Sequence, residues 1–211
     1  MPRTYPSTVL PNVQVDPVNV VSTHPNAALN GLAAINTHAM VEALLLNVFS
    51  GLLGRKKAYG FGSIGEKEKS FRHVAKVSVD PSDLSRIEWS LDAVTQSRQG
   101  RDVLVNSLWA TDDKFPDYIV LMDQESLNDT SESIVAAVEA VKIDEGDAIE
   151  IQNTMRSGLS LWDENDMGKA RSDAVRAMTA IISSNILLTS SDEMKRSEAR
   201  QVIDDIISMC E

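Results

Sequence analysis

Five of the seven prolines in this 211-residue chain lie within its first 26 residues, at positions 2, 6, 11, 17 and 25. Proline fixes the backbone φ angle and lacks an N–H donor, so this spacing excludes a regular helix. Valine and leucine side chains lie between the prolines, which makes the segment too apolar for a solvated tail. We therefore predict an extended N-terminal arm over residues 1–26 that packs on the same chain or on a neighbouring copy. The arm residues expected to make an oligomer contact are Val9, Leu10, Val13, Val15, Val18, Val20 and Val21.

Beyond the arm, apolar residues recur mostly at helical spacing. The most apolar stretch, residues 27–53, includes several asparagines, a histidine and Glu42. A membrane span tolerates few such groups, so we expect a buried helix there. The sequence predicts a mainly α fold with a helical bundle-like core and little β structure. Residues 27–211 are expected to form a single domain.

Shorter patterns indicate individual elements. Asp80 and Pro81 combine a capping residue with a first-turn proline, which is typical of a helix start. Residues 71–79 alternate and are rich in valine, which predicts one strand. Residues 118–122 are apolar throughout and fit either a strand or a short helix, because periodicity cannot decide between them.

The charge of the chain is unevenly distributed. Its net charge is −11, which disfavours broad contact with nucleic acid or an anionic membrane. Residues 55–79 nevertheless hold seven basic and two acidic residues, a net charge of +5, whereas residues 80–211 hold twelve basic and 27 acidic residues, a net charge of −15. This separation suits an electrostatic head-to-tail contact between copies.

The basic segment contains the stretch GFGSIG, in which Gly60, Gly62 and Gly65 match a dinucleotide-binding pattern. That turn requires a buried strand before it and a helix after it. Here the preceding residues are a helix end followed by basic residues, and no P-loop lysine follows. We interpret residues 54–70 as a flexible Gly-rich basic loop that joins two parts of the chain, with binding of another anion as the alternative.

Other motifs of catalysis or ligand binding do not occur in the sequence. His24, His38 and His73 are far apart, and no pair has metal-ligand spacing on one helix. The single cysteine is next to last, and no nucleophile elbow is present. We therefore expect no catalytic, cofactor or metal site and do not expect an enzyme, although an enzyme without a recognisable motif is a further alternative.

These observations favour a structural protein that associates with itself, in the class of a viral or phage particle subunit, with other particle subunits as partners. Its expected location is the virion, or otherwise the cytoplasm, because the N-terminus lacks the apolar run of a secretion signal. No membrane partner is expected. The alternative is a nucleocapsid-like protein that binds nucleic acid through its basic segment. The residues expected to contact that anion are Arg55, Lys56, Lys57, Lys67, Lys69, Arg72 and Lys76.

Overall fold

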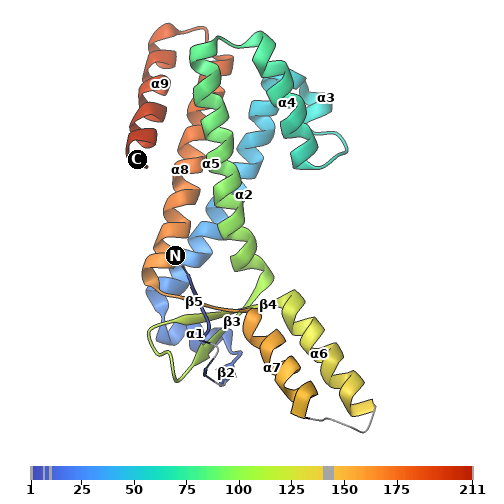
Figure 1. Cartoon of the computed structure of the whole chain (residues 1–211). Coiled ribbons are helices and arrows are strands. Elements are labelled where there is room, and N and C mark those ends of the chain that lie inside the picture. Colours follow the sequence, from blue (N-terminus) through green and yellow to red (C-terminus); the bar gives the residue numbers. More distant parts are fainter. Residues whose placement is uncertain (1, 7, 10, 140–144, 211) are drawn as a thin grey trace. The chain divides into compact units, whose positions relative to one another are not determined.

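The computed structural model describes residues 2–6, 8, 9, 11–139 and 145–210 (Figure 1). Helices predominate among them, and the predicted mainly α class is confirmed. The chain divides into two compact units. Unit 1 comprises Met1–Ala33 and Arg101–Ala170, and unit 2 comprises Ala34–Gly100 and Arg171–Glu211. Three helices contribute residues to both units: α2 (Pro25–Leu53), α5 (Pro81–Asn106) and α8 (Glu164–Thr189).

Unit 1 is built on a five-stranded sheet with the strand order β1-β5-β4-β3-β2. All neighbouring strands are antiparallel. The central strand β4 is buried over four successive residues, so the apolar stretch at 118–122 forms a strand. The strands are β1 (Arg3–Thr4), β2 (Val13–Gln14), β3 (Ser107–Asp112), β4 (Ile119–Asp123) and β5 (Leu159–Trp162).

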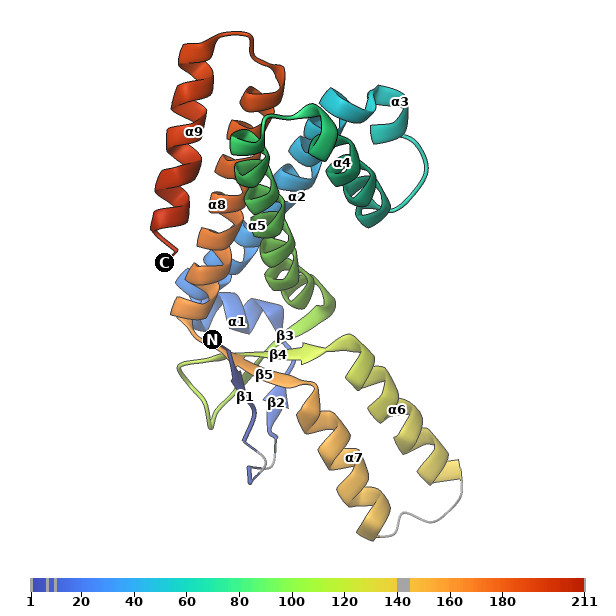
Figure 2. The same cartoon turned by 45° about the horizontal axis from the view of Figure 1, so that its top comes forward.

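A helical hairpin connects β4 to β5. It consists of α6 (Gln124–Glu139) and α7 (Glu145–Ser157), which lie side by side in both views (Figures 1 and 2). The Asp123 carboxylate accepts a hydrogen bond from the Ser126 amide at 3.0 Å, which satisfies a free N–H at the start of α6.

The N-terminal arm packs on its own chain. β1 pairs with β5, and β2 pairs with β3. The Tyr5 hydroxyl donates a hydrogen bond of 2.5 Å to Asp112, whose other oxygen accepts from the Lys114 amide at 2.9 Å. The Tyr5 ring packs edge-on against Phe115. The arm thus supplies two strands and a buried aromatic side chain to unit 1.

The prediction that the arm is extended throughout is wrong for Pro17–Thr23, which form helix α1. The Asp16 carboxylate accepts hydrogen bonds from the Val18 and Asn19 amides. Pro17 occupies the first helical position, where its missing N–H leaves no helical hydrogen bond unmade. Proline spacing therefore excluded one long helix over the arm, but not a short helix that starts at a proline.

Unit 2 is a helical core formed by parts of α2, α5 and α8 together with α3 (Arg55–Ala58), α4 (Ile64–Ser78) and α9 (Glu193–Ser208). Its centre is aliphatic, with Phe49 and Phe71 in ring contact at 5.1 Å. The largest fully buried side chains there are Leu45, Phe49, Phe71, Ile87, Leu91, Ile181 and Ile203.

The strand predicted over residues 71–79 is wrong, because these residues belong mostly to α4. Phe71 and Ala75 are buried, one helical turn apart, whereas Val77 is 81% exposed. The valines satisfied an alternating pattern, but burial follows the helical period. A stronger local signal was present in the sequence: Ser63 and Glu66 form a capping box that starts the helix.

Candidate functional site

The basic segment forms two helices joined by a short loop. Gly54, with φ at +78°, separates α2 from α3, and the capping box starts α4 at Ile64. The loop predicted over residues 54–70 is therefore confined to residues 59–63, which we call the 59–63 loop. It joins α3 to α4.

Two glycines of the GFGSIG stretch are explained by the geometry of the loop. A Cβ atom on Gly60 would lie 2.5 Å from the Lys56 carbonyl oxygen, a distance that no side chain tolerates. Gly62 has φ at +117°, a conformation that L-residues rarely adopt. The helix N-terminus that follows is occupied by Glu66, whose carboxylate accepts from the Ser63 amide at 2.8 Å. The Ser63 hydroxyl donates a second hydrogen bond to this carboxylate. Together the two hydrogen bonds lower the pKa of the Glu66 carboxyl.

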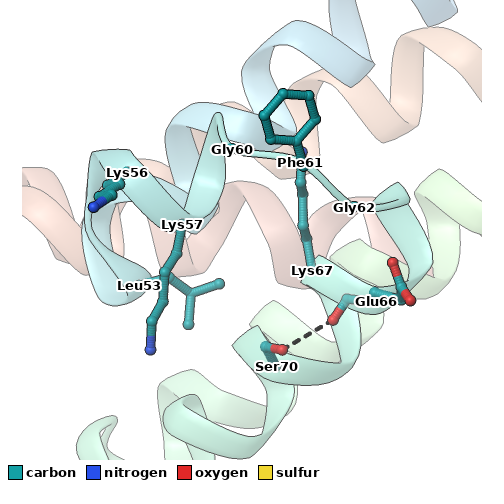
Figure 3. Close-up of a pocket in the computed structure, with 9 residues that line it drawn as sticks. All are labelled: Leu53, Lys56, Lys57, Gly60, Phe61, Gly62, Glu66, Lys67 and Ser70. Atoms are coloured by element: carbon teal, nitrogen blue, oxygen red, sulfur yellow. Dashed lines mark hydrogen bonds between the residues drawn. The ribbon is translucent and has the colours of Figure 1, made fainter.

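A pocket of about 730 Å³ lies beside this loop (Figure 3). Lys56 and Lys57 come from α3, Phe61 comes from the loop, and Lys67 comes from α4. The ammonium groups of Lys56 and Lys57 lie apart in Figure 3, and the Phe61 ring points away from both. The remaining lining residues are Leu53, Gly60, Gly62, Glu66 and Ser70.

The structure brings together only part of the predicted anion-binding set. Lys56, Lys57 and Lys67 line the pocket. Lys69 and Lys76 are exposed on α4, but helical geometry places them roughly 180–200° around the helix from Lys67. The two remaining residues do not line the pocket either. Arg55 is exposed on α3, and Arg72 bridges Glu68 and Asp92 at 2.8 Å each.

The predicted arm contacts divide into two groups. Val9 and Val13 pack against the unit 1 core, and Val20 is fully buried in α1. Exposed positions are occupied by Val15, Val18 and Val21, and Leu10 lies outside the described residues.

The exposed side chains of α1 and α2 include no charge. Between residues 17 and 51 the only charged residue is Glu42, which is partly buried and lies 3.4 Å from His38 and 3.5 Å from Arg98. In unit 1 the exposed residues of these helices include several large apolar side chains. We call Val18, Val21, Leu29 and Leu32, together with Val15 just before α1, the N-terminal apolar surface. Within unit 2 the exposed residues of α2 are Asn36, Ala39, Met40, Ala43, Asn47 and Gly51.

A buried polar cluster in unit 2 contains the residue types of a catalytic site, a histidine beside a serine and a glutamate, but not the setting of one. His38 Nδ1 lies 2.9 Å from the Ser97 hydroxyl, and its other nitrogen faces Glu42. Yet His38 and Ser97 are both buried, and neither lines the basic pocket. His38 is paired with Ser97 inside a helical core, and hydrogen bonding between buried polar groups is the ordinary reason for such a contact.

Unit 1 contains a second, more polar pocket of about 470 Å³ at the edge of the sheet. Asp102 and Asp123 contribute carboxylates, but Asp102 is paired with Arg101 at 2.7 Å and Asp123 caps α6. Within the described residues, no group of three His, Cys, Asp or Glu side chains could hold a metal ion. This pocket therefore presents hydroxyl groups and engaged carboxylates, and sequence patterns gave no signal for it.

Comparison with protein families, with characterised proteins and with solved structures finds no match. Within the described residues, α2 is long and apolar enough to cross a membrane by length and composition. Core helices of soluble proteins meet the same criterion, and 33% of its most apolar window is buried.

Proposed function

We propose that this protein is a structural protein that associates with further copies of itself, as a subunit of a viral or phage particle does. The observation that carries the proposal is the lack of charge on the exposed residues of α1 and α2. About a quarter of the chain is charged, yet residues 17–51 expose apolar and uncharged polar side chains only. Charged residues are depleted at the centres of protein interfaces, where their desolvation is unfavourable.

A second copy is the partner that the charges favour. Each chain carries a net charge of −11, so two copies repel each other over most of their surfaces. A face without charges allows the closest approach at the smallest electrostatic cost. A two-fold contact places the same face on both sides, so Leu29 and Leu32 of one copy would meet apolar side chains of the other.

In the proposed contact the arm uses its exposed side chains and not its backbone. Its strands are already paired within unit 1, so an exchange of the arm between copies is not required. Deleting residues 1–25 would remove two strands and Tyr5 from unit 1. Point variants at exposed positions therefore test the contact better than a deletion does.

The test compares the mass of the full chain with that of Leu29→Glu/Leu32→Glu, by light scattering during gel filtration. We expect a mass well above 23.1 kDa for the unmodified chain and a lower one for the variant. Met194→Glu/Val77→Glu adds the same charge at exposed apolar sites of α9 and α4 and should leave the mass unchanged. Circular dichroism should be the same for all three proteins.

Salt distinguishes the two modes of association. A contact through uncharged residues persists in 1 M salt, whereas a head-to-tail contact between the +5 and −15 segments weakens as the screening length falls to about 3 Å. A mass of 23.1 kDa at both salt concentrations would overturn the proposal. Recovery of the unmodified chain in membranes, with a monomeric mass in detergent, would also overturn it and assign α2 to a bilayer.

A further inference from the structure

The positive charge of the basic pocket is not neutralised within the chain. Two acidic residues lie among the lysines in the sequence: Glu66 also lines the pocket, and Glu68 does not. Glu66 accepts hydrogen bonds from the Ser63 amide and hydroxyl, and Glu68 is paired with Arg72. No ion pair joins Lys56, Lys57 or Lys67 to another residue in the part of the chain that the structure describes. Their charge is available to an external anion.

Two aromatic side chains are exposed beside these lysines. Phe61 is fully exposed at the tip of the 59–63 loop, between Gly60 and Gly62. Tyr59 is half exposed, and its hydroxyl donates a hydrogen bond to Asn47 on α2, which fixes the position of the ring. A fully exposed phenylalanine contributes nothing to the core of its own chain, and its flat face is free to stack on another ring.

We propose that the basic pocket binds single-stranded nucleic acid, with Phe61 stacking on a base and Lys56, Lys57 and Lys67 contacting successive phosphates. Exposed aromatic side chains combined with a positively charged groove are the features by which proteins bind single strands without reading their sequence. A base bound by stacking needs no hydrogen-bonding partner.

The spacing of the lysines favours an extended chain over a free nucleotide. Lys56 and Lys57 direct their ammonium groups apart (Figure 3), so they do not converge on one phosphate. The helix N-terminus beside them, which would cradle a nucleotide phosphate, already holds the Glu66 carboxylate. A duplex hides its bases from Phe61 and brings more negative charge towards an acidic protein, so it is the poorer ligand.

The test measures binding of fluorescein-labelled (dT)20, of a 20-nucleotide uridine RNA and of a 20-base-pair duplex to the full chain by fluorescence anisotropy. We expect both single strands to bind at 50 mM salt, more tightly than the duplex. Three phosphate contacts give a slope of about −2 for the logarithm of the binding constant against the logarithm of salt concentration. Affinity should then fall about 20-fold between 50 and 200 mM salt.

Variants assign the binding to the pocket. Lys56→Gln/Lys57→Gln should weaken binding and reduce the salt slope by about 1.4. Phe61→Ala should weaken it about tenfold through lost stacking, with the salt slope unchanged. Lys69→Gln/Lys76→Gln removes the same charge from the opposite side of α4 and should bind as the unmodified chain does. All these side chains are exposed, so their replacement does not affect the core.

Several outcomes would overturn the proposal. One is the absence of binding at 50 mM salt, and another is an equal loss in the two lysine variants. Unchanged affinity in Phe61→Ala would remove the stacking and with it the preference for single strands. Binding to vesicles of anionic phospholipid, with none to the oligonucleotides, would assign Phe61 and the lysines to a membrane surface. The readout is binding of the labelled strand, so a chain that stays monomeric still tests this proposal.

Discussion

The substitution Asp83→Asn tests whether one buried carboxylate holds α9 against α5. Asp83 lies in the first turn of α5 and is 1% exposed. Its oxygens accept from Arg196 Nη2 at 2.7 Å, from Arg200 Nε at 2.7 Å and from Arg200 Nη2 at 3.2 Å. Asparagine preserves the shape of the side chain but removes its charge. It also turns an NH₂ group towards a guanidinium group, so at least one of these hydrogen bonds is lost.

The stability lost in Asp83→Asn depends on how deeply Asp83, Arg196 and Arg200 are buried. A hydrogen bond to a charged group contributes about 1.5–3 kcal/mol, and removal of one partner from a buried ion pair costs about 3–5 kcal/mol. The two arginines are 29% and 27% exposed, so water replaces part of what they lose, and Glu193 still holds Arg200. We therefore expect Asp83→Asn to cost about 3 kcal/mol, the lower end of the range for a broken buried ion pair. Hydrogen exchange of the α9 amides should show a loss of protection of about 100-fold.

The pH dependence provides a second readout with a defined sign. The hydrogen bonds from Arg200 and Arg196 lower the pKa of the Asp83 carboxyl, against the opposing effect of burial. A lowered pKa in the folded state means that the contribution to stability is complete above the unfolded-state pKa of about 3.9. It is lost as the pH falls through the lower folded-state value. The hydrogen-exchange protection of α9 should therefore decline with acid in the unmodified chain. The part of this decline that comes from protonation of Asp83 should be absent from Asp83→Asn.

A matched control lies on the same helix. Asp92 is 72% exposed and makes one ion pair, with Arg72. Asp92→Asn makes the same chemical change there, and an exposed ion pair contributes only about 0.2–1 kcal/mol. Equal protection of α9 in the two variants, or wild-type exchange in Asp83→Asn, would refute the assignment of Asp83 as the residue that holds α9.

Three further predictions follow from local geometry. Tyr5→Phe removes the hydrogen bond to buried Asp112 and should lower the free energy of unfolding of unit 1 by about 1–3 kcal/mol in denaturant titration; an unchanged midpoint would contradict the anchoring of the arm. Burial and the neighbouring carboxylate raise the pKa of Tyr5, so spectrophotometric titration of the three tyrosines should find one that resists ionisation until the protein unfolds. Gly60→Ala places a Cβ 2.5 Å from the Lys56 carbonyl oxygen and should destabilise the 59–63 loop, whereas Gly65→Ala meets open space and should be neutral or stabilising by up to about 1 kcal/mol.

Signals within a few residues of one another predicted much of unit 2. The start of α5 at Pro81 agrees with the expected helix start. Residues 27–53 lie in helix α2 as their spacing predicted, although Leu29, Leu32 and Met40 are exposed and not buried. Both depend on local capping and periodicity, which the chain carries within one or two turns. The prediction for residues 71–79 failed because a valine-rich pattern was given more weight than the Ser63–Glu66 capping box.

The candidate site was predictable in composition but not in arrangement. The sequence identified the lysines and the exposed glycine-rich stretch. The prediction of a loop over 54–70 and a strand over 71–79 did not separate Lys67 from Lys69 and Lys76, because that separation depends on α4 being a helix. The partners of Glu66 and Glu68 depend on the same helix, since Glu66 belongs to the capping box and Glu68 pairs with Arg72 one turn further along α4. The charge available in the pocket is therefore known only from the structure.

Pairing of the arm with the sheet lay beyond any local signal. Tyr5 and Asp112 are 107 residues apart, and the strands that the arm joins begin at Ser107 and Leu159. A proline-rich apolar segment is equally suited to a groove on its own chain or on a neighbour, and only tertiary pairing distinguishes the two.

This pairing changes what an assembly contact can use. Strands β1 and β2 of the arm already pair with β5 and β3 within unit 1. Strand exchange would first have to break these pairs and expose Tyr5 and Asp112. Side chains such as Val18, Leu29 and Leu32 carry no such cost, because they are exposed already. An association driven by them keeps each copy folded as it is, is reversed by single charges on one helix face, and tolerates high salt. The glutamate variants test these consequences without disturbing the fold.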